Sequence, residues 1–382
     1  MEKYEIIDFL GEGSFAKVSK AKVIKTEELV AIKKLKKKYT TWQECVDLRE
    51  VKALNKCKQN DNIIKLKEMI RIEDTLYLVF EYMEKNLYQL ITERQNKKLT
   101  EGQIRYILWQ TLQGVAYQHK YGFFHRDLKP ENLLVGDEKI KIADFGLARE
   151  IRSIPPYTDY VATRYYRAPE CILKSTNYNS PVDIWAVGCI MAELYNFKPI
   201  FYGGSEKEVL FRIASIIGPP NNLNWADGLQ LAKKIGINFP ATLSNSTSLG
   251  QVIPDASSEA LDLIGEMLKW DPNKRATAAN LLNHPFFTGH PIGNRISSPE
   301  KSQHKANESK KTFSSYNHNH NKIDKKESEP KSIKTEPYSN MNVNSEISYS
   351  TKKDNDDEIS KLLEDTVGFN KCKKNNLLIK KT

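Results

Sequence analysis

The sequence His125–Asn132, which reads HRDLKPEN, is followed at a short distance by Asp144-Phe145-Gly146. Between these polar stretches lie two strand-like runs, Leu133–Val135 and Lys139–Ile142, separated by a glycine-containing turn. This pattern predicts a β-hairpin. A hairpin would hold the acidic residues at its two ends on a rigid support, so the two stretches are expected to form one site.

Three residues in these stretches carry the chemistry. Asp127 could orient and deprotonate an attacking hydroxyl group. Asn132 and Asp144 offer the hard oxygen ligands that Mg²⁺ prefers when it bridges the phosphates of ATP. A charged surface loop is the simplest alternative, but it does not account for both stretches at this spacing. The sequence therefore predicts a phosphoryl-transfer centre that uses ATP and Mg²⁺.

The two stretches resemble the catalytic loop and the metal-binding triplet of protein kinases. An upstream segment agrees with this resemblance. A strand from Tyr4 to Leu10, expected to alternate toward the interior, runs into Gly11-Glu12-Gly13-Ser14, and a second strand ends near Ile24. Glycines let the backbone approach phosphate closely, although Ala16 replaces the third glycine of the usual pattern. We expect this turn to form a lid over the phosphates.

An apolar strand, Val30-Ala31-Ile32, ends in Lys33, where kinases place the lysine that holds the α and β phosphates. Thr41–Glu44 reads as a capping box that starts a helix, and this helix carries Arg49 and Glu50. Adjacent helical residues point about 100° apart, so only one of the two can face Lys33. Glu50 is the candidate for the ion pair with Lys33.

The strand Leu76–Phe80 leads into Glu81-Tyr82-Met83, which resembles the kinase hinge that meets the adenine edge, with Phe80 as gatekeeper. The resemblance implies catalytic roles for Lys33, Glu50, Asp127 and Lys129, of which Lys129 would stabilise the transferring phosphoryl group. It implies metal ligands at Asn132 and Asp144. Nucleotide binding is implied for Leu10, Gly11, Glu12, Gly13, Ser14, Val18, Ala31, Lys33, Phe80, Glu81, Met83, Asn132, Leu134 and Asp144.

The segment after the metal triplet contains Thr158-Asp159-Tyr160, which places two phosphorylatable hydroxyl groups two residues apart. A phosphate adds nearly two negative charges and is ordered by arginine; Arg49, Arg126 and Arg149 are the candidates. We therefore expect a switch in which an upstream kinase phosphorylates Thr158, with Tyr160 as a second regulatory site. A flexible loop that happens to contain Thr and Tyr is the alternative.

Lys129 stands where tyrosine kinases carry a different sequence, which favours serine or threonine as the acceptor. In the kinases that this chain resembles, Thr163 contacts the base and this lysine. Arg164 and Arg167 resemble the arginines of proline-directed kinases, which shape the pocket for a proline after the acceptor. The resemblance thus implies protein substrates with Ser/Thr-Pro sites.

Capping patterns predict the large helices of the second half. Thr100–Gln103 should start a helix beneath the catalytic loop, and Ser180–Asp183, with Ser180 as N-cap, should start an apolar helix that reaches Leu194. By resemblance, Asp183 braces the catalytic-loop backbone. Glu170 is expected to pair with Arg275 in the same way.

The insertion at about 219–253, expected to be rich in loops, marks the CMGC group of kinases. Within it, Thr158-Asp159-Tyr160, Pro155-Pro156-Tyr157 and Gly122-Phe123-Phe124 look closest to the male germ cell-associated and intestinal cell kinases, MAK and ICK. The resemblance implies an α+β bilobal kinase domain over 1–288, with a β-rich N-lobe at about 1–83 and a mainly helical C-lobe at about 84–288. The composition of 289–382 predicts a disordered basic tail.

Composition limits the partners. The 382 residues carry a formal charge of +10, and 18 of the 58 basic and 13 of the 48 acidic residues follow position 288. Neither part is basic enough to favour nucleic acid. No apolar run is long enough to span a bilayer, and five scattered cysteines fit reduced thiols without zinc. We expect a monomer, and the resemblance to the MAK and ICK kinases implies that it lies in the cytoplasm and nucleus.

Two alternatives remain open at this point. A cyclin-dependent kinase has a similar pattern at Arg49-Glu50, but Trp42–Leu48 does not resemble a cyclin-contacting sequence. A pseudokinase scaffold would bind partners without catalysis, which the complete set of catalytic positions disfavours. Resemblance to the MAK and ICK kinases further implies a role in cilium or flagellum length and transport.

Overall fold

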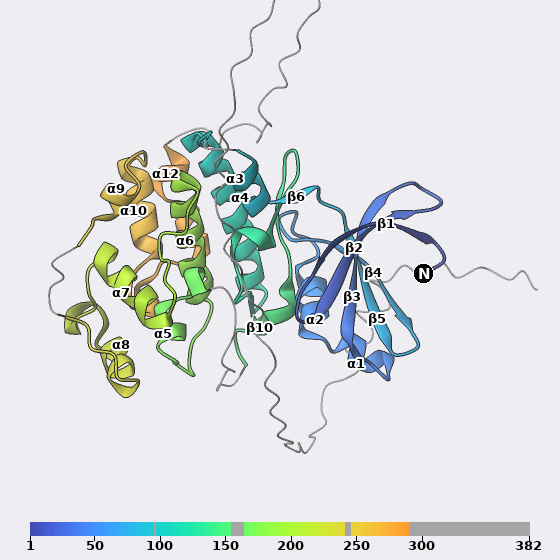
Figure 1. The fold of residues 1–382 in the computed structure, drawn as a ribbon, viewed down its shortest axis with the longest axis horizontal. Coiled ribbons are helices and arrows are strands. Elements are labelled where there is room, and N and C mark those ends of the chain that lie inside the picture. The colour runs from blue at the N-terminus through green and yellow to red at the C-terminus, as the bar shows by residue number, and fades with distance from the viewer. Residues whose placement is uncertain (95–96, 154–163, 241–245, 290–382) are drawn as a thin grey trace, which may run out of the picture. The chain divides into compact units, whose positions relative to one another are not determined.

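The computed structural model describes residues 1–94, 97–153, 164–240 and 246–289. Its N-terminal part is a five-stranded antiparallel sheet in the order β1-β2-β3-β5-β4, with two helices between β3 and β4 (Figure 1). The strands are β1 (Tyr4–Glu12), β2 (Ala16–Val23), β3 (Leu29–Lys38), β4 (Leu66–Ile72) and β5 (Thr75–Glu81). The helices are α1 (Trp42–Val46) and α2 (Arg49–Cys57).

The rest of the described chain is mainly helical. Its long helices are α3 (Leu87–Glu93), α4 (Glu101–Lys120), α6 (Pro181–Asn196), α7 (Glu206–Ile217), α8 (Asn222–Lys234) and α10 (Ser258–Met267). Four-residue helices are α5 (Pro169–Ile172), α9 (Leu249–Val252), α11 (Ala278–Leu281) and α12 (Pro285–Thr288). Short 3₁₀ turns cover Pro130–Asn132, Phe145–Leu147, Arg164–Tyr166 and Pro272–Lys274. The predicted bilobal α+β fold is confirmed.

Short strands form the junction between the sheet and the helices. They are β6 (Lys85–Asn86), β7 (Phe123–Phe124), β8 (Leu133–Val135), β9 (Ile140–Ile142) and β10 (Arg149–Glu150). The predicted hairpin is β8–β9, in which Leu134 faces Lys141. The last residue of β9 is hydrogen-bonded to the segment just before β4. Ile64 N donates to Ile142 O (2.9 Å), and Ile142 N donates to Asn62 O (2.8 Å).

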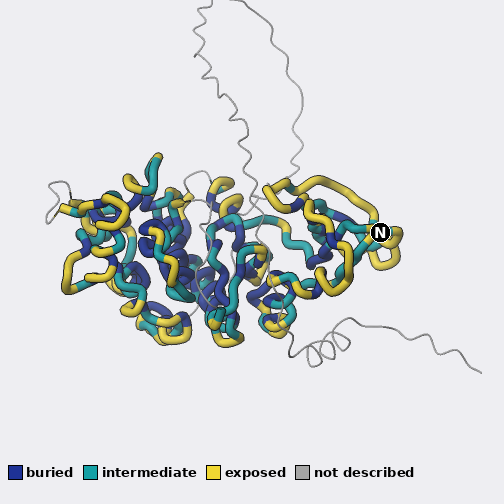
Figure 2. Tube along the Cα trace, turned by 90° about the horizontal axis from the view of Figure 1, so that it is seen from below, coloured by how far each residue is buried: buried dark blue, intermediate teal, exposed yellow. Residues whose placement is uncertain are grey.

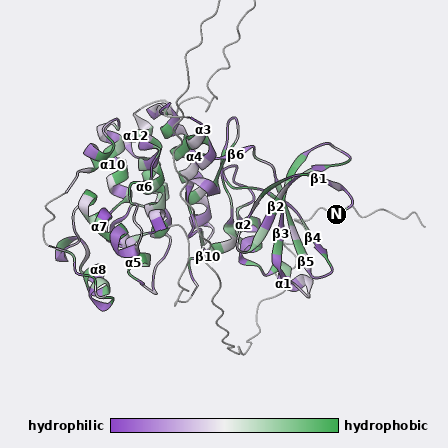
Figure 3. Cartoon of the chain, viewed as in Figure 1, coloured by the Kyte–Doolittle hydropathy of each residue, from purple (hydrophilic) through white to green (hydrophobic). Residues whose placement is uncertain are grey.

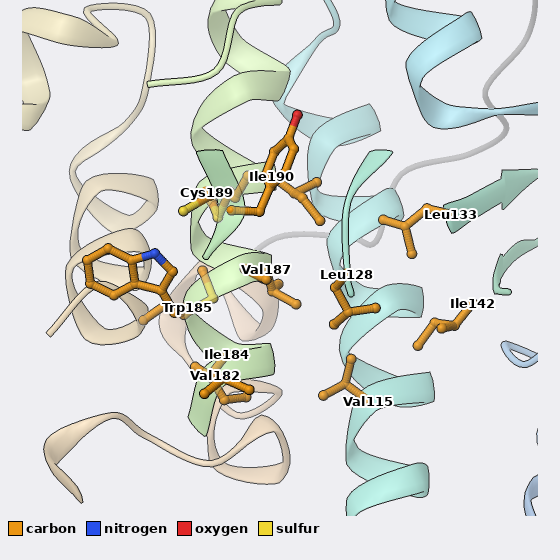
Figure 4. Packing of buried hydrophobic residues seen from close by; sticks show 14 of the residues in the cluster. Val115, Leu128, Leu133, Ile142, Val182, Ile184, Trp185, Val187, Cys189 and Ile190 are labelled. Atoms are coloured by element: carbon orange, nitrogen blue, oxygen red, sulfur yellow. The ribbon is translucent and has the colours of Figure 1, made fainter. Parts of the chain in front are cut away.

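Helix α6 forms the centre of the C-lobe core. In Figure 4, Leu128 of the catalytic loop lies between Val187 on α6 and Val115 on α4. These three side chains are buried, and on the other side of α6 Trp185 stacks on Phe201 with ring centroids 5.5 Å apart. Figure 3 shows hydrophobic segments alternating with hydrophilic ones along the helices around this core. The catalytic loop is thus held from below by apolar packing.

The predicted strand at the N-terminus is present, but its predicted alternation is wrong. Ile6, Ile7 and Phe9 are each at least half exposed. Because β1 is the outer strand of the sheet, its side chains are covered less than those of the central strands. Figure 2 shows this part of the N-lobe as exposed, in contrast to the dark interior of the C-lobe.

The single helix predicted after Thr41 is two helices. Thr41 caps the first of them, since its side chain accepts a hydrogen bond from Glu44 N. The helix ends at Val46, and the non-helical backbone of Leu48 (φ −57°, ψ 129°) separates it from α2. In one continuous helix Cys45 and Glu50 would point about 140° apart. The break lets both of them be buried.

Two further local predictions need correction. Ser180 does not cap α6 with its side chain, because Ser180 itself is helical and the first turn starts one residue earlier, where Asn179 O accepts from Val182 N (3.0 Å). The insertion predicted to be rich in loops contains α8 and α9. Within the described ranges, no helix combines the length and the apolar character needed to span a membrane.

Candidate active site

Lys33 on β3 joins the two lobes. Its ammonium nitrogen lies 2.6 Å from Glu50 Oε1 on α2 and 2.8 Å from Asp144 Oδ1, which precedes the Phe145–Leu147 turn. The strand register places Lys33 beside Val18 on β2 and Leu78 on β5, in the middle of the sheet. Arg49, the neighbour of Glu50, points elsewhere and is half exposed. The structure thus brings together the predicted lysine, its helix partner and the acidic end of the hairpin.

The charges of this cluster depend on one another. Burial alone would lower the pKa of Lys33, but the carboxylates of Glu50 and Asp144 outweigh it and raise the pKa well above its usual range. The partial loss of water around the half-exposed Asp144 would raise its pKa, yet the neighbouring Lys33 lowers it. The pKa of Glu50 is raised, by burial first and also by the negative charge of Asp144. One lysine therefore pairs with two carboxyl groups, so an additional cation near them would be stabilised.

Asp127 lies at the centre of the catalytic loop with only 8% of its surface exposed. Its Oδ2 is 3.1 Å from Lys129 Nζ and also accepts a hydrogen bond from Asn132 Nδ2 (3.1 Å). Asn132 Nδ2 donates to the Asp127 carbonyl as well (2.8 Å), which fixes the turn. The carboxylate is therefore held in a fixed position by its two neighbours, and a fixed position is what a base that orients a hydroxyl group needs.

Asp183 on α6 supports this loop from within the core. Its carboxylate accepts hydrogen bonds from His125 N (2.7 Å) and Arg126 N (2.8 Å), and from the His119 ring nitrogen (2.8 Å) when that nitrogen is protonated. Arg126 has a φ of +73°, which is costly for a residue with a side chain, and these bonds hold that conformation. Burial would raise the pKa of Asp183, but its partners lower it. The sequence predicted this brace, but not the ring of His119 in it.

The donor set suits a magnesium ion bound together with phosphates. Asp144 is about half exposed, and Asn132 Oδ1 is not used in holding Asp127. A Cβ at Gly146 would lie 3.3 Å from Asp144 Oδ1, so glycine keeps that side of the carboxylate open. No cluster of three or more His, Cys, Asp or Glu residues able to hold a metal occurs in the described chain. A site of one carboxylate and one amide matches Mg²⁺, which takes its remaining ligands from water and phosphate.

The residues predicted to bind nucleotide lie on the sheet above this centre and on the hairpin below it. Leu10 to Ser14 occupy the end of β1 and its turn, and a Cβ at Gly11 or Gly13 would meet nothing within 4 Å. Ala31 pairs with Phe80 across β3 and β5. Met83 lies over the hairpin turn, with its methyl 3.1 Å from a Cβ built at Gly136. The described positions are compatible with a nucleotide between the lobes, although their roles stay predictions.

The three arginines of the predicted switch lie close together. Arg126 donates to Tyr178 Oη (2.5 Å), and Arg49 Nε is 3.9 Å from Glu150 Oε2. Burial lowers the pKa of Arg149, and the positive charges of Arg49 and Arg126 lower it further. Thr158 and Tyr160 lie outside the described residues, so the phosphate-binding step is a prediction.

The predicted substrate residues are described in part. Arg164 donates to the Gly204 carbonyl (2.8 Å), and Arg167 pairs with Glu206 at the start of α7 (2.9 Å). Thr163 lies outside the described residues. The two arginines therefore tie the segment that contains them to Gly204 and to the first residue of α7.

Sequence reasoning missed two contacts of these functional segments. One is Tyr178, whose ring lies against Arg126 and whose position carries no motif. The other is the ion pair of Lys141 on β9 with Glu81 at the end of β5 (2.8 Å). For Lys141 a signal existed, because a charged residue between Ile140 and Ile142 on a short strand requires a partner when both faces are covered.

Comparison with known proteins agrees with this geometry. The model of the protein kinase domain matches residues 4–287. The chain is 55% identical over 295 residues to the Mus musculus serine/threonine-protein kinase ICK, and 53% identical over 288 residues to the Homo sapiens serine/threonine-protein kinase MAK. These matches cover 77% and 75% of this chain. They span about half of the relatives, 46% of each.

A further relative is the cyclin-dependent kinase F-3 of Oryza sativa subsp. japonica, which is 48% identical over 304 residues, covering 80% of this chain and 69% of the relative. The resemblance to MAK and ICK predicted from the sequence is confirmed by the first two matches. The catalytic loop, the metal triplet and the lysine–glutamate pair all lie within the region that the family model matches. The chain belongs to the protein kinase family.

Proposed function

We propose that this protein is a serine/threonine kinase that transfers the γ-phosphoryl group of ATP to protein substrates. The observation that carries the proposal is Lys33, which contacts both Glu50 and Asp144 and so aligns the phosphate-holding lysine with the end of the hairpin. The complete set of catalytic residues disfavours a scaffold without activity. The relatives at 53–55% identity are named serine/threonine-protein kinases.

The residues divide the work as follows. Lys33, held by Glu50, binds the α and β phosphates. Asp127 orients the acceptor hydroxyl and accepts its proton, while Lys129, 3.1 Å away, stabilises the negative charge of the transferring group. Asn132 and Asp144 would hold Mg²⁺, which would neutralise charge on the phosphates.

Activation and specificity are finer parts of the proposal. Phosphorylation of Thr158, with Tyr160 as a second site, would supply the anion that Arg49, Arg126 and Arg149 require. The pKa of Arg149 supports this role for a phosphate. Burial lowers that pKa, and repulsion from the positive charges of Arg49 and Arg126 lowers it further. Arg164 and Arg167, fixed on Gly204 and Glu206, support a pocket that prefers proline after the acceptor.

The test is phosphorylation of a Ser/Thr-Pro peptide library by the purified chain. Asp127→Asn should reduce kcat by about 10²-fold or more, since a positioned base contributes that much. The matched control is Asp137→Asn, an exposed aspartate on the turn of the same hairpin, which should retain activity. Thr158→Ala should stay at the basal rate after treatment with an activating kinase.

Two outcomes would contradict the proposal. If the wild-type protein phosphorylated on Thr158 and Tyr160 were as silent as Asp127→Asn, the chain would be a scaffold. If Ser-Ala peptides were used as well as Ser-Pro peptides, the proline preference would be wrong while the kinase activity stood.

The cellular part of the proposal rests on the resemblance to the MAK and ICK kinases alone. It places the protein in the cytoplasm and nucleus and gives it a role in cilium or flagellum length and transport. Imaging the tagged chain in a ciliated cell tests it, and exclusion from the cilium with unchanged cilium length in a deletion strain would contradict it.

A further inference from the structure

Lys141 is a buried lysine in the middle of β9. Its side chain is 8% exposed, and its neighbours Ile140 and Ile142 are fully buried. Lysine is almost never buried without a partner, because removing its charge from water is costly. The partner is Glu81, whose Oε1 lies 2.8 Å from Lys141 Nζ.

The Glu81 carboxylate also binds the backbone just before β4. The same oxygen accepts a hydrogen bond from Lys65 N (2.8 Å), just before β4, and Glu81 N donates to the Lys65 carbonyl (3.2 Å). Glu81 thus connects the end of β5, the start of β4 and the hairpin strand β9. A carboxylate with two charged or polar donors and 22% exposure is held in a single orientation.

The position of this pair gives it a functional meaning. Glu81 belongs to the segment that we propose meets the adenine edge through its backbone. Lys141 lies three residues before Asp144, and it faces Leu134 in the adjacent strand β8. The ion pair therefore links the adenine-binding segment to the strand that carries the proposed metal ligand.

We propose that the side chains of Glu81 and Lys141 are positioning residues that set the hinge backbone at the correct distance from Asp144, and so determine how well the site recognises the amino group of adenine. This inference rests on the proposed ATP-dependent function. A merely structural ion pair would stabilise the fold but would not change which base is preferred.

The test compares ATP with purine riboside triphosphate, which lacks the 6-amino group of adenine, in calorimetric binding to the full chain. Lys141→Met keeps the apolar stem, and Glu81→Gln keeps an acceptor oxygen for Lys65 N. Each should weaken ATP binding by about tenfold, equivalent to about 1.4 kcal/mol, and weaken the analogue much less. The double variant should bind ATP no more weakly than the single variant with the lower affinity, because each single substitution already removes the same ion pair.

The matched control is Lys139→Met on the same hairpin, which removes an exposed pair with Asp61 (3.0 Å) and should leave the preference for ATP unchanged. Equal discrimination between the two nucleotides in the wild type, Glu81→Gln and Lys141→Met would overturn the inference, even if the Lys141→Met variant melts earlier. Glu81→Gln decides the case should Lys141→Met fail to fold. If the wild-type protein bound neither nucleotide, the proposed function itself would be wrong.

Discussion

Glu193 on α6 shows how strongly a single buried carboxyl group can respond to pH. It is 3% exposed, and its Oε2 accepts a hydrogen bond from Tyr166 Oη (2.7 Å). Burial raises the pKa of Glu193 to about 7, with a further contribution from the negative charge of Glu131, although the Tyr166 bond opposes the shift. Burial and Glu193 also raise the pKa of Tyr166, so its hydroxyl remains a donor.

The sign of the effect on stability follows from proton binding. Between the ordinary pKa of 4.5 and about 7, the folded state keeps a proton on Glu193 that the unfolded state releases. The contribution of Glu193 to the free energy of unfolding therefore falls as pH rises through this range, by at most about 3 kcal/mol. Glu193→Gln removes the titration, so we expect it to melt later than wild type at pH 8, with a smaller difference at pH 5. Thermal unfolding at both pH values measures this.

The control for this prediction is Glu266→Gln, which removes an exposed carboxylate paired with Lys269 and should show no such pH dependence. An equal difference in melting temperature between Glu193→Gln and wild type at pH 5 and pH 8 would show that the carboxyl group is ionised throughout.

At the scale of elements, the pair of Glu170 and Arg275 fastens α5 to the C-lobe core. The guanidinium binds both carboxylate oxygens (2.6 and 2.7 Å), and each side chain is at most 3% exposed. Arg275 also donates to the carbonyls of Pro181 and Trp270. Removing the carboxylate leaves a buried arginine without its counter-charge, which costs about 3–5 kcal/mol.

We therefore expect Glu170→Ala to lower the free energy of unfolding by about 3–5 kcal/mol in urea, against less than about 1 kcal/mol for Glu266→Ala at the surface. Phosphoryl transfer should fall at 37 °C because of unfolding, while the folded fraction at low temperature still binds ATP. A stable Glu170→Ala variant without activity would instead show that Glu170 acts in the chemistry.

The elements also show where sequence reasoning succeeds. The capping box Thr100–Gln103 is a purely local pattern, and it starts α4 as predicted. The pattern at Ser180 is equally local, yet the turn closes one residue earlier at Asn179, because the chain enters α6 already helical. The break between α1 and α2 depends on burying Cys45 and Glu50 together, which is a tertiary requirement. Local signals predict that a helix exists, whereas packing decides where it breaks.

On the scale of the whole molecule, the residues of the site could be predicted because they occur in motifs. The distances between them could not be predicted, because they depend on the fold. Lys33 and Asp144 are 111 positions apart, and only the fold brings them to 2.8 Å. The motifs identified Lys33, Glu50, Asp127 and Asn132 without any distance. Lys141, Glu81 and Tyr178 act through contacts between segments, for which the sequence offers at most the anomaly of a charge on a buried strand.

This arrangement predicts that nucleotide and metal stabilise both lobes together. A ligand bound only by the folded state raises its stability by about 2.7 kcal/mol at a hundredfold excess over Kd, which corresponds to a rise of about 5 °C in melting temperature. Adding ATP with MgCl₂ should raise the melting temperature more than ATP with EDTA, because the proposed ligands Asp144 and Asn132 would then bind the metal. Asp144→Asn should lose the metal-dependent part of the rise and keep the rest, whereas Asp137→Asn on the exposed turn should behave as wild type. If Mg²⁺ added nothing in the wild type, neither residue would be a metal ligand, and if it added as much in Asp144→Asn, Asp144 would not be one.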